Sequence, residues 1–246
     1  MKIDLNCDMG ESFGRYKLGN DGAVMPFVTS ANIACGLHAG DPLVMRSTIR
    51  LAKQCGVAIG AHPGWPDLQG FGRRDMAFAA DEVEAFVLYQ IGALAALART
   101  EGVPLTHVKP HGALYNQAAK DAVLAAAIAR AVKAWDDELI LVGLAGSAMI
   151  TAGLAKDLRV ASEAFPDRRY NADGTLVSRT EASAVLVSTE EVAANAVRLA
   201  REGIDIGGRR VQVDTLCLHG DNPSAVDNAR LVHEALEKAG IQVRAI

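Results

Sequence analysis

The sequence has no concentrated run of lysine and arginine, and its formal net charge is −4. Binding to nucleic acid needs clustered cations against phosphates, so we expect nucleic acid not to be the main partner. No apolar run reaches the roughly 18 residues of a membrane span, and the N-terminus, MKIDLNCDMGE, turns polar too early for a signal peptide. The four cysteines lack C-x-x-C spacing, which is typical of reduced thiols and favours a cytoplasmic location.

Several motifs of nucleotide and metal sites are also missing. The sequence has no G-x-x-x-x-G-K-[ST] loop, no strand–G-x-G-x-x-G–helix unit and no H-E-x-x-H. Aromatic residues make up only 5% of the chain, whereas half of it is hydrophobic. The core is therefore expected to consist mainly of alanine, valine, leucine and isoleucine, and no standard nucleotide site is indicated.

Short strand-like runs alternate with segments of helical period along most of the chain. The predicted strands cover residues 2–6, 30–34, 57–61, 106–109, 139–144, 159–164 and 214–220. The predicted helices cover residues 41–53, 81–99, 121–133, 189–201 and 224–238, and a hairpin is expected around Gly207-Gly208. Because no linker interrupts this alternation, we predict one α/β domain over residues 1–246 with a mostly parallel sheet.

The predicted strands have one apolar and one polar face. In the first strand Asp4, Asn6 and Asp8 share a face, and His107 and Lys109 do so in the fourth. An open parallel sheet covered by helices on both sides is apolar on both faces. Polar faces that converge on an interior instead favour an irregular, TIM-like (β/α) barrel of seven strands, with its active site at the C-terminal strand ends.

Polar side chains collect at these strand ends, where five of the six histidines lie. The candidate site residues are Asn6, Asp8, Asn32, His38, His62, Lys109, His111, Tyr115, Glu163, Arg168, Arg169, His219 and Asp221. Each has a structural explanation when taken alone, since a single strand-end histidine is more often a hydrogen-bonding residue than a catalyst. Gathering so many polar groups is costly unless they bind something. Asp41 is expected to cap a helix, and His107 to support the site.

The residue types indicate two kinds of chemistry. Lys109 beside His111 is suited to binding an anionic oxygen, and Asp8 and Glu163 to general acid–base catalysis if burial raises their pKa. These four are the predicted catalytic residues. A metal held by Asp8, His38, His62 and His219 is the weaker alternative, because no tight ligand spacing supports it, and no metal is expected.

Six segments resemble the LamB/YcsF family: DLNCDMGESFG, ANIACGLHAGDP, AHPGWPDLQGFGRR, VKPHGALYN, EAFPDRRYNADGTLVSR and LCLHGDNP. They occur in the expected order between residues 2 and 223. The resemblance implies an irregular (β/α) barrel related to glycoside hydrolase and deacetylase folds. It also implies ATP-dependent opening of 5-oxo-L-proline to L-glutamate by a 5-oxoprolinase that includes partner subunits B and C. Without a P-loop in this chain, ATP, accompanied by Mg²⁺, is expected on a partner.

Residue chemistry gives these candidates provisional roles in lactam opening. Asp8 or Glu163 would activate water, while Lys109 and His111 would stabilise a developing oxyanion or phosphate. Arg168 or Arg169 would pair with the substrate carboxylate. The remaining substrate-binding candidates are Asn6, Asn32, His38, His62, Tyr115, His219 and Asp221. Two other classes stay open: a metal-dependent amidohydrolase or deacetylase acting alone, and a non-catalytic subunit that delivers the lactam to B and C.

Overall fold

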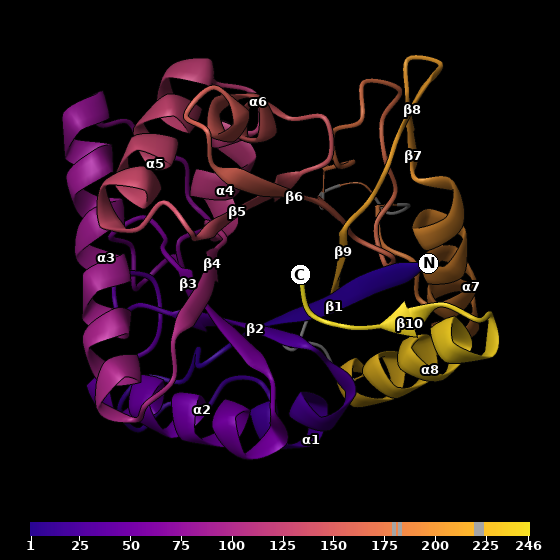
Figure 1. The fold of residues 1–246 in the computed structure, drawn as a ribbon, viewed down its shortest axis with the longest axis horizontal. Helices are drawn as coiled ribbons and strands as arrows, with labels where there is room; N and C mark the ends of the chain where they lie inside the picture. Colours follow the sequence, from indigo (N-terminus) through magenta and orange to yellow (C-terminus); the bar gives the residue numbers. More distant parts are fainter. Residues whose placement is uncertain (179–180, 182–183, 219–223) are drawn as a thin grey trace.

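A closed ring of seven parallel strands forms the centre of the molecule (Figure 1). The computed structural model describes residues 1–178, 181, 184–218 and 224–246. The ring runs in the order β1 (Lys2–Met9), β2 (Ser30–Ala34), β3 (Ala58–His62), β4 (Leu105–Val108), β5 (Ile140–Leu144), β6 (Arg159–Ala164) and β9 (Thr215–Leu218). Strand β9 pairs back to β1 and closes the barrel. The predicted seven-stranded barrel is confirmed, and β10 (Gln242–Val243) adds to the start of β1 outside the ring.

Helices surround the ring (Figure 1). The five predicted helices are confirmed as α2 (Pro42–Cys55), α3 (Ala80–Thr100), α5 (Ala122–Trp135), α7 (Thr189–Glu202) and α8 (Ala225–Lys238). Asp41 caps α2, as predicted, by accepting hydrogen bonds from the backbone N–H groups of Leu43 and Val44. Four short helices were not predicted: α1 (Asp21–Val24), the 3-10 helix Met25–Phe27, α4 (Gly112–Ala118) and α6 (Ala148–Leu154).

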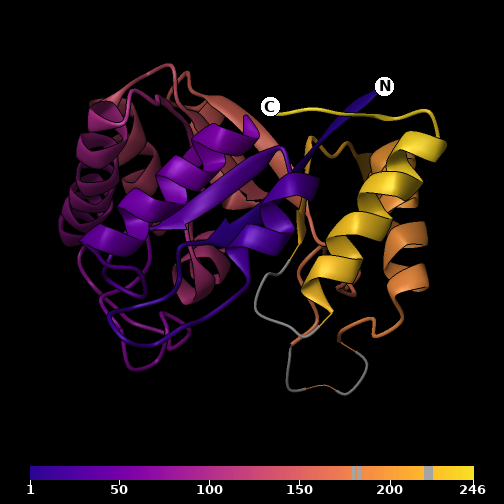
Figure 2. The same cartoon turned by 90° about the horizontal axis from the view of Figure 1, so that it is seen from below.

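Two smaller features complete the fold. The predicted hairpin is confirmed as the antiparallel pair β7 (Ile204–Ile206) and β8 (Arg209–Val211). Helices α7 and α8 pack side by side along one flank of the barrel (Figure 2).

Helix α3 meets, by length and composition, the criteria for a membrane-crossing helix. It packs on α5 and on the barrel strand β3. Its buried side chains, which include Val87, Ile91 and Leu94, recur at helical spacing. One such helix is weak evidence for a membrane, because a core helix passes the same test, and this packing accounts for its apolar character.

The strands turn apolar side chains toward the helices and polar side chains into the barrel. Leu5, Val108 and Leu216 are fully buried in the apolar layer, while Asn6 and Thr215 are buried in the interior. Strand register places Asn6 beside Cys217 and Asp8 beside Asn32. The predicted two-faced strands are thus the cause of a polar barrel interior.

Glycine is required at one barrel position. Gly60 on β3 pairs with His107 on β4, and a Cβ atom at residue 60 would lie 2.2 Å from the imidazole ring. The missing side chain therefore makes room for His107 inside the barrel.

Candidate active site at the barrel mouth

A cavity of about 570 Å³ opens at the C-terminal ends of the strands. Its lining includes the predicted residues Asp8, His62, Lys109, His111, Tyr115 and Arg168. The remaining charged residues of the lining are Arg73, Lys120 and Glu181. A (β/α) barrel carries its chemistry at this end, so the cavity is the candidate active site.

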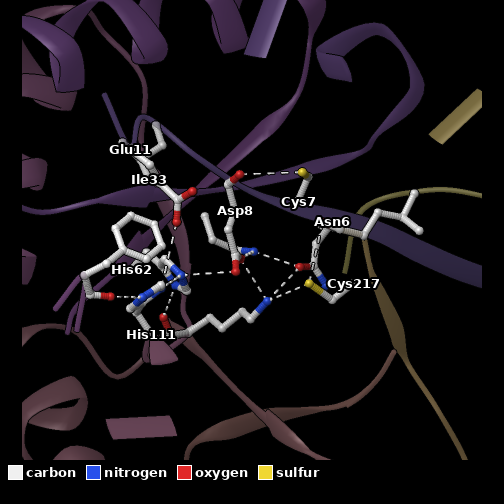
Figure 3. A network of polar contacts seen from close by, with 12 residues as sticks. Asn6, Cys7, Asp8, Glu11, Ile33, His62, His111 and Cys217 are labelled. Atoms are coloured by element: carbon white, nitrogen blue, oxygen red, sulfur yellow. Dashed lines mark hydrogen bonds and ion pairs between the residues drawn. The ribbon is translucent and has the colours of Figure 1, made fainter. Parts of the chain in front are cut away.

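Lys109 is buried at the cavity floor among four acceptors. Its Nζ lies 2.9 Å from both Asp8 Oδ1 and Glu163 Oε1, 3.2 Å from Asn6 Oδ1 and 3.0 Å from Cys217 Sγ. Figure 3 shows three of these partners, Asn6, Asp8 and Cys217, turned toward the same point. We call Lys109 and these four residues the lysine cluster. The fully buried Cys217 is therefore a contact of the ammonium group.

The charges of the lysine cluster set its protonation states. Burial opposes the charged form of Lys109, but the neighbouring Asp8, Cys217 and Glu163 outweigh it and raise the lysine pKa well above its ordinary value. Burial likewise favours a protonated Asp8, yet His62 and Lys109 hold its pKa well below the usual range. Burial therefore does not raise the pKa of Asp8 on balance, and Asp8 is a carboxylate paired with an ammonium group.

The two predicted catalytic carboxylates occupy different depths. The Asp8 side chain is 17% exposed and borders the cavity, whereas the Glu163 side chain is fully buried below Lys109. Burial and the neighbouring Glu163 raise the pKa of Tyr115 well above its ordinary value, so the phenol stays protonated. Asp8 is thus the carboxylate that can meet a bound molecule.

Asn6 and Asn32 lie beneath the cavity and brace the carboxylates. Asn6 Nδ2 donates to Glu163 Oε1 at 2.9 Å, and Asn32 Nδ2 donates to Asp8 Oδ1 at 2.9 Å. His107 Nε2 lies 2.8 Å from Asn32 Oδ1, which places His107 in the supporting role predicted for it. Among the described residues that border the cavity, neither asparagine appears, so both act through their neighbours.

A second cluster lies beside the first and consists of Glu11, His38, His62 and His111. Figure 3 shows three of its members, Glu11, His62 and His111, next to Asp8. We call it the histidine cluster. All four residues are buried, and one possible metal-ligand atom from each, a ring nitrogen or a carboxylate oxygen, lies within 4.8 Å of the others. His62 links the two clusters, because its Nε2 is 3.3 Å from Asp8 Oδ2.

The histidine cluster differs from the metal set considered from sequence. His38 and His62 belong to both sets, but Glu11 and His111 join them, while Asp8 adjoins through His62. His219, a member of the set considered from sequence, lies outside the described residues, as does Asp221.

The two predicted arginines differ in position. Arg168 is buried and borders the cavity, where its guanidinium donates to the backbone oxygens of Val177 and Ala184. Arg169 is exposed and is not among the described residues of the cavity lining. Arg73, which sequence reasoning did not single out, borders the cavity with its guanidinium 4.9 Å from the centre of the Phe71 ring.

Other residues were missed for identifiable reasons. Glu11 follows β1 directly, a strand-end position that points to the site, but it was not selected. His111 directly precedes α4, where it has an extended backbone conformation. The letters GESFG, residues 10–14, also match G-x-S-x-G. Ser12 there bonds the backbone of Leu18, and no long helix follows it directly, unlike a nucleophile elbow.

Known proteins with similar sequences and structures cover the whole chain. The A subunit of 5-oxoprolinase from Geobacillus kaustophilus (strain HTA426) is 55% identical, and the alignment spans 99% of this chain and 96% of that protein. The crystal structure of the lactam utilization protein from Thermus thermophilus superposes with a TM-score of 0.93 at 50% identity, covering 100% of both chains.

A more distant structure shares the fold alone. It is a putative cellobiose-phosphate cleavage protein from Enterococcus faecalis V583, with a TM-score of 0.61 and 14% identity, covering 98% of this chain and 96% of the other. The LamB/YcsF family itself matches residues 3–246. This chain therefore belongs to the LamB/YcsF family.

Proposed function

We propose that this chain is the A subunit of an ATP-dependent 5-oxoprolinase, a cytoplasmic hydrolase that opens 5-oxo-L-proline to L-glutamate together with subunits B and C. The observation that carries the proposal is the end-to-end similarity to relatives that are named as the A subunit of 5-oxoprolinase. ATP, with Mg²⁺, is placed on a partner subunit, because this sequence has no phosphate-binding loop of a standard type.

The charges around the cavity suit this substrate. Arg73, Lys109, Lys120 and Arg168 border it, against Asp8 and Glu181. 5-Oxo-L-proline carries a carboxylate, and phosphorylation of its lactam oxygen by ATP adds further negative charge. A mainly cationic lining favours both species. Since Arg169 is exposed away from the lining, Arg73 and Arg168 are the arginines that we assign to the substrate carboxylate.

The geometry divides the catalytic roles. Asp8 is ionised and faces the cavity, and it activates the water that adds to the ring carbon bearing the phosphorylated oxygen. The ring C–N bond then breaks and the nitrogen takes a proton. A second water hydrolyses the resulting acyl phosphate to glutamate and phosphate. Lys109 and His111 lie beside the developing oxygen charge, while Glu163 holds Lys109 in place from below.

The test is the release of glutamate from 5-oxo-L-proline and ATP by the three subunits together, and with each one omitted. Asp8→Asn is expected to lower kcat by about 10²- to 10⁴-fold, the usual contribution of a general base. Asp137→Asn is the matched control, since Asp137 pairs with Lys133 on the surface and is expected to keep full turnover.

Other outcomes of this experiment would indicate a different function for the chain. Full turnover without this chain would refute the proposal. Normal turnover by Asp8→Asn, together with calorimetric binding of 5-oxo-L-proline to the isolated chain, would identify a delivery subunit. Glutamate release by this chain alone without ATP, stopped by a chelator, would identify a metal-dependent amidohydrolase.

A further inference from the structure

The rings of His62 and His111 meet through two nitrogen atoms, His62 Nε2 and His111 Nδ1, which are 3.0 Å apart. The other nitrogen of each ring lies beside a backbone carbonyl oxygen. His62 Nδ1 is 2.6 Å from the oxygen of Lys109, and His111 Nε2 is 2.8 Å from the oxygen of Phe71. A carbonyl oxygen only accepts hydrogen bonds, so in each ring the nitrogen next to the carbonyl carries the proton.

These two bonds leave unprotonated nitrogens facing each other. Two lone pairs 3.0 Å apart repel unless a positive charge lies between them. Carboxylate oxygens flank the pair: Asp8 Oδ2 is 3.3 Å from His62 Nε2, and Glu11 Oε1 is 3.9 Å from His111 Nδ1. The ligand atoms of Glu11, His62 and His111 therefore all lie within 4.8 Å of one another, and Asp8 adjoins them at His62.

His38 provides an independent sign of an additional ligand. It is 1% exposed, and within the described part of the chain neither of its ring nitrogens has a hydrogen-bond partner. A buried polar group without a partner is costly. Its ring stacks on His111 with a centroid distance of 3.9 Å and an interplanar angle of 5°. Lone pairs in two parallel ring planes cannot meet at one point, so the His38 ring must rotate to join a shared ligand.

We propose that a divalent transition-metal ion of the Zn²⁺ type binds between these rings. Its ligands are His62 Nε2, His111 Nδ1 and the carboxylates of Glu11 and Asp8, with His38 as a further ligand after rotation. Zn–N bonds of about 2.0–2.1 Å separate tetrahedral ligand atoms by about 3.4 Å, close to the observed spacings. Imidazole and carboxylate ligands together suit Zn²⁺, Fe²⁺ or Co²⁺.

The backbone carbonyls complete this assignment. Histidines that bind metals typically donate their second ring N–H to a carbonyl or carboxylate, which fixes the tautomer and the ring orientation. Both His62 and His111 have such a bond. When bound, an ion of this type supplies Lewis acidity at the cavity floor. The site is a property of the isolated chain, so its test needs neither ATP nor partner subunits.

The experiment is calorimetric titration of Zn²⁺ into the chelator-treated chain, with Co²⁺ absorption as a second measurement of the ligand set. We expect one ion per chain. His62→Gln and His111→Gln are expected to weaken Zn²⁺ binding by about 100-fold or more, beyond the usual loss for an outer-shell residue. His233→Gln is the control, because His233 lies on α8, where its ring is 25% exposed and its Nδ1 is 3.0 Å from the backbone oxygen of Phe27, and it should bind Zn²⁺ with unchanged affinity.

Circular dichroism establishes that each variant is folded before its binding is compared. Absence of stoichiometric binding by Zn²⁺, Co²⁺ and Fe²⁺ would overturn the proposal and leave a shared proton between the rings. Equal Zn²⁺ affinities for folded His62→Gln and His233→Gln would overturn it as well. Both results are independent of whether the complex opens 5-oxo-L-proline.

Discussion

The two clusters at the barrel mouth are neighbours with opposite hydrogen-bonding character. In the lysine cluster a cation lies among acceptors, with Asp8 and Glu163 each 2.9 Å from the Lys109 ammonium group. In the histidine cluster acceptors face acceptors across 3.0 Å. The cation of the first cluster has its acceptors within the protein, whereas the facing ring nitrogens of the second, in the tautomers set by the backbone carbonyls, have no proton between them.

Because of this difference, we expect the lysine cluster to hold one geometry and the histidine cluster to bind a ligand. A buried charge that has its partners is held in one geometry, and removing either partner is costly. Buried lone pairs that lack a donor instead retain the capacity to bind a ligand. Asp8 borders both clusters, which couples the fixed cation to the proposed metal site. Substitutions that break one cluster at a time therefore separate the two properties.

The largest effect is expected from Lys109→Met. Removing the ammonium group leaves Asp8 and Glu163 without their cation in the barrel interior, and breaking a buried pair in this way costs about 3–5 kcal/mol. Urea unfolding monitored by circular dichroism measures the loss. Adding Glu163→Gln to Lys109→Met should restore part of the stability, because one uncompensated charge is then removed.

Lys133→Met is the matched control for this loss. Lys133 contacts Asp137 at the surface, and a surface substitution of this kind changes stability by no more than about 0.5 kcal/mol. A Lys109→Met loss as small as that of the control would contradict the account of the lysine cluster. So would a double variant less stable than the single one.

A smaller effect, confined to the histidine cluster, is expected from Gly64→Ala. A Cβ atom at residue 64 would lie 2.5 Å from His38 Nδ1 and 2.8 Å from His38 Cγ, so the His38 ring must move. Overpacking of this kind costs about 1–3 kcal/mol. We also expect weaker Zn²⁺ binding, measured by calorimetry, because His38 lies within the proposed site.

Gly92→Ala is the control that distinguishes crowding of His38 from the effect that a glycine-to-alanine substitution has on the backbone. Gly92 lies within α3, where an added Cβ would meet only the Trp135 ring, at an ordinary 3.5 Å. Alanine in a helix interior is about 0.5–1 kcal/mol more favourable than glycine. If Gly64→Ala matched Gly92→Ala in both stability and Zn²⁺ affinity, the packing argument for His38 would be wrong.

The sequence was sufficient for the barrel because its strands carry a pattern that survives folding unchanged. Alternating polar and apolar residues in β1 and β4 predict an inward polar face, and the structure has Asn6, His107 and Lys109 buried inside. Closure of seven strands follows from the same pattern. Short helices such as α4 and α6 were not predicted, because seven residues give too little periodicity to recognise.

The division of the site into two clusters was not predictable in the same way. Strand-end position groups Asp8, Glu163 and Lys109, but it does not tell which carboxylate reaches the cavity. That depends on strand register, which sets Glu163 below Lys109. The tautomers of His62 and His111 depend on backbone carbonyls that only the folded chain brings near, so the facing of their unprotonated nitrogens could not be predicted from the sequence.

The last expected effect is a change in the pH dependence of stability on replacing His107. Burial, and then the charge of Lys109, lower the pKa of His107 to about 3. The unfolded chain, with an ordinary histidine pKa of about 6.5, therefore binds a proton between about pH 6.5 and 3 that the folded chain does not. Its contribution to stability is complete above about pH 6.5 and falls, as the pH drops, by at most about 1.4 kcal/mol per pH unit.

His107→Gln removes this one titrating group, so its unfolding free energy should depend less steeply on pH between about 6 and 4 than that of the parent chain. Urea unfolding at a series of pH values, in the presence of chelator, measures both slopes. A residual slope is expected, because burial also lowers the pKa of His111 to about 3. Parallel curves for the parent and His107→Gln would show that His107 takes up its proton in the folded chain as readily as in the unfolded chain. The lowered pKa of His107 inside the barrel would then be wrong.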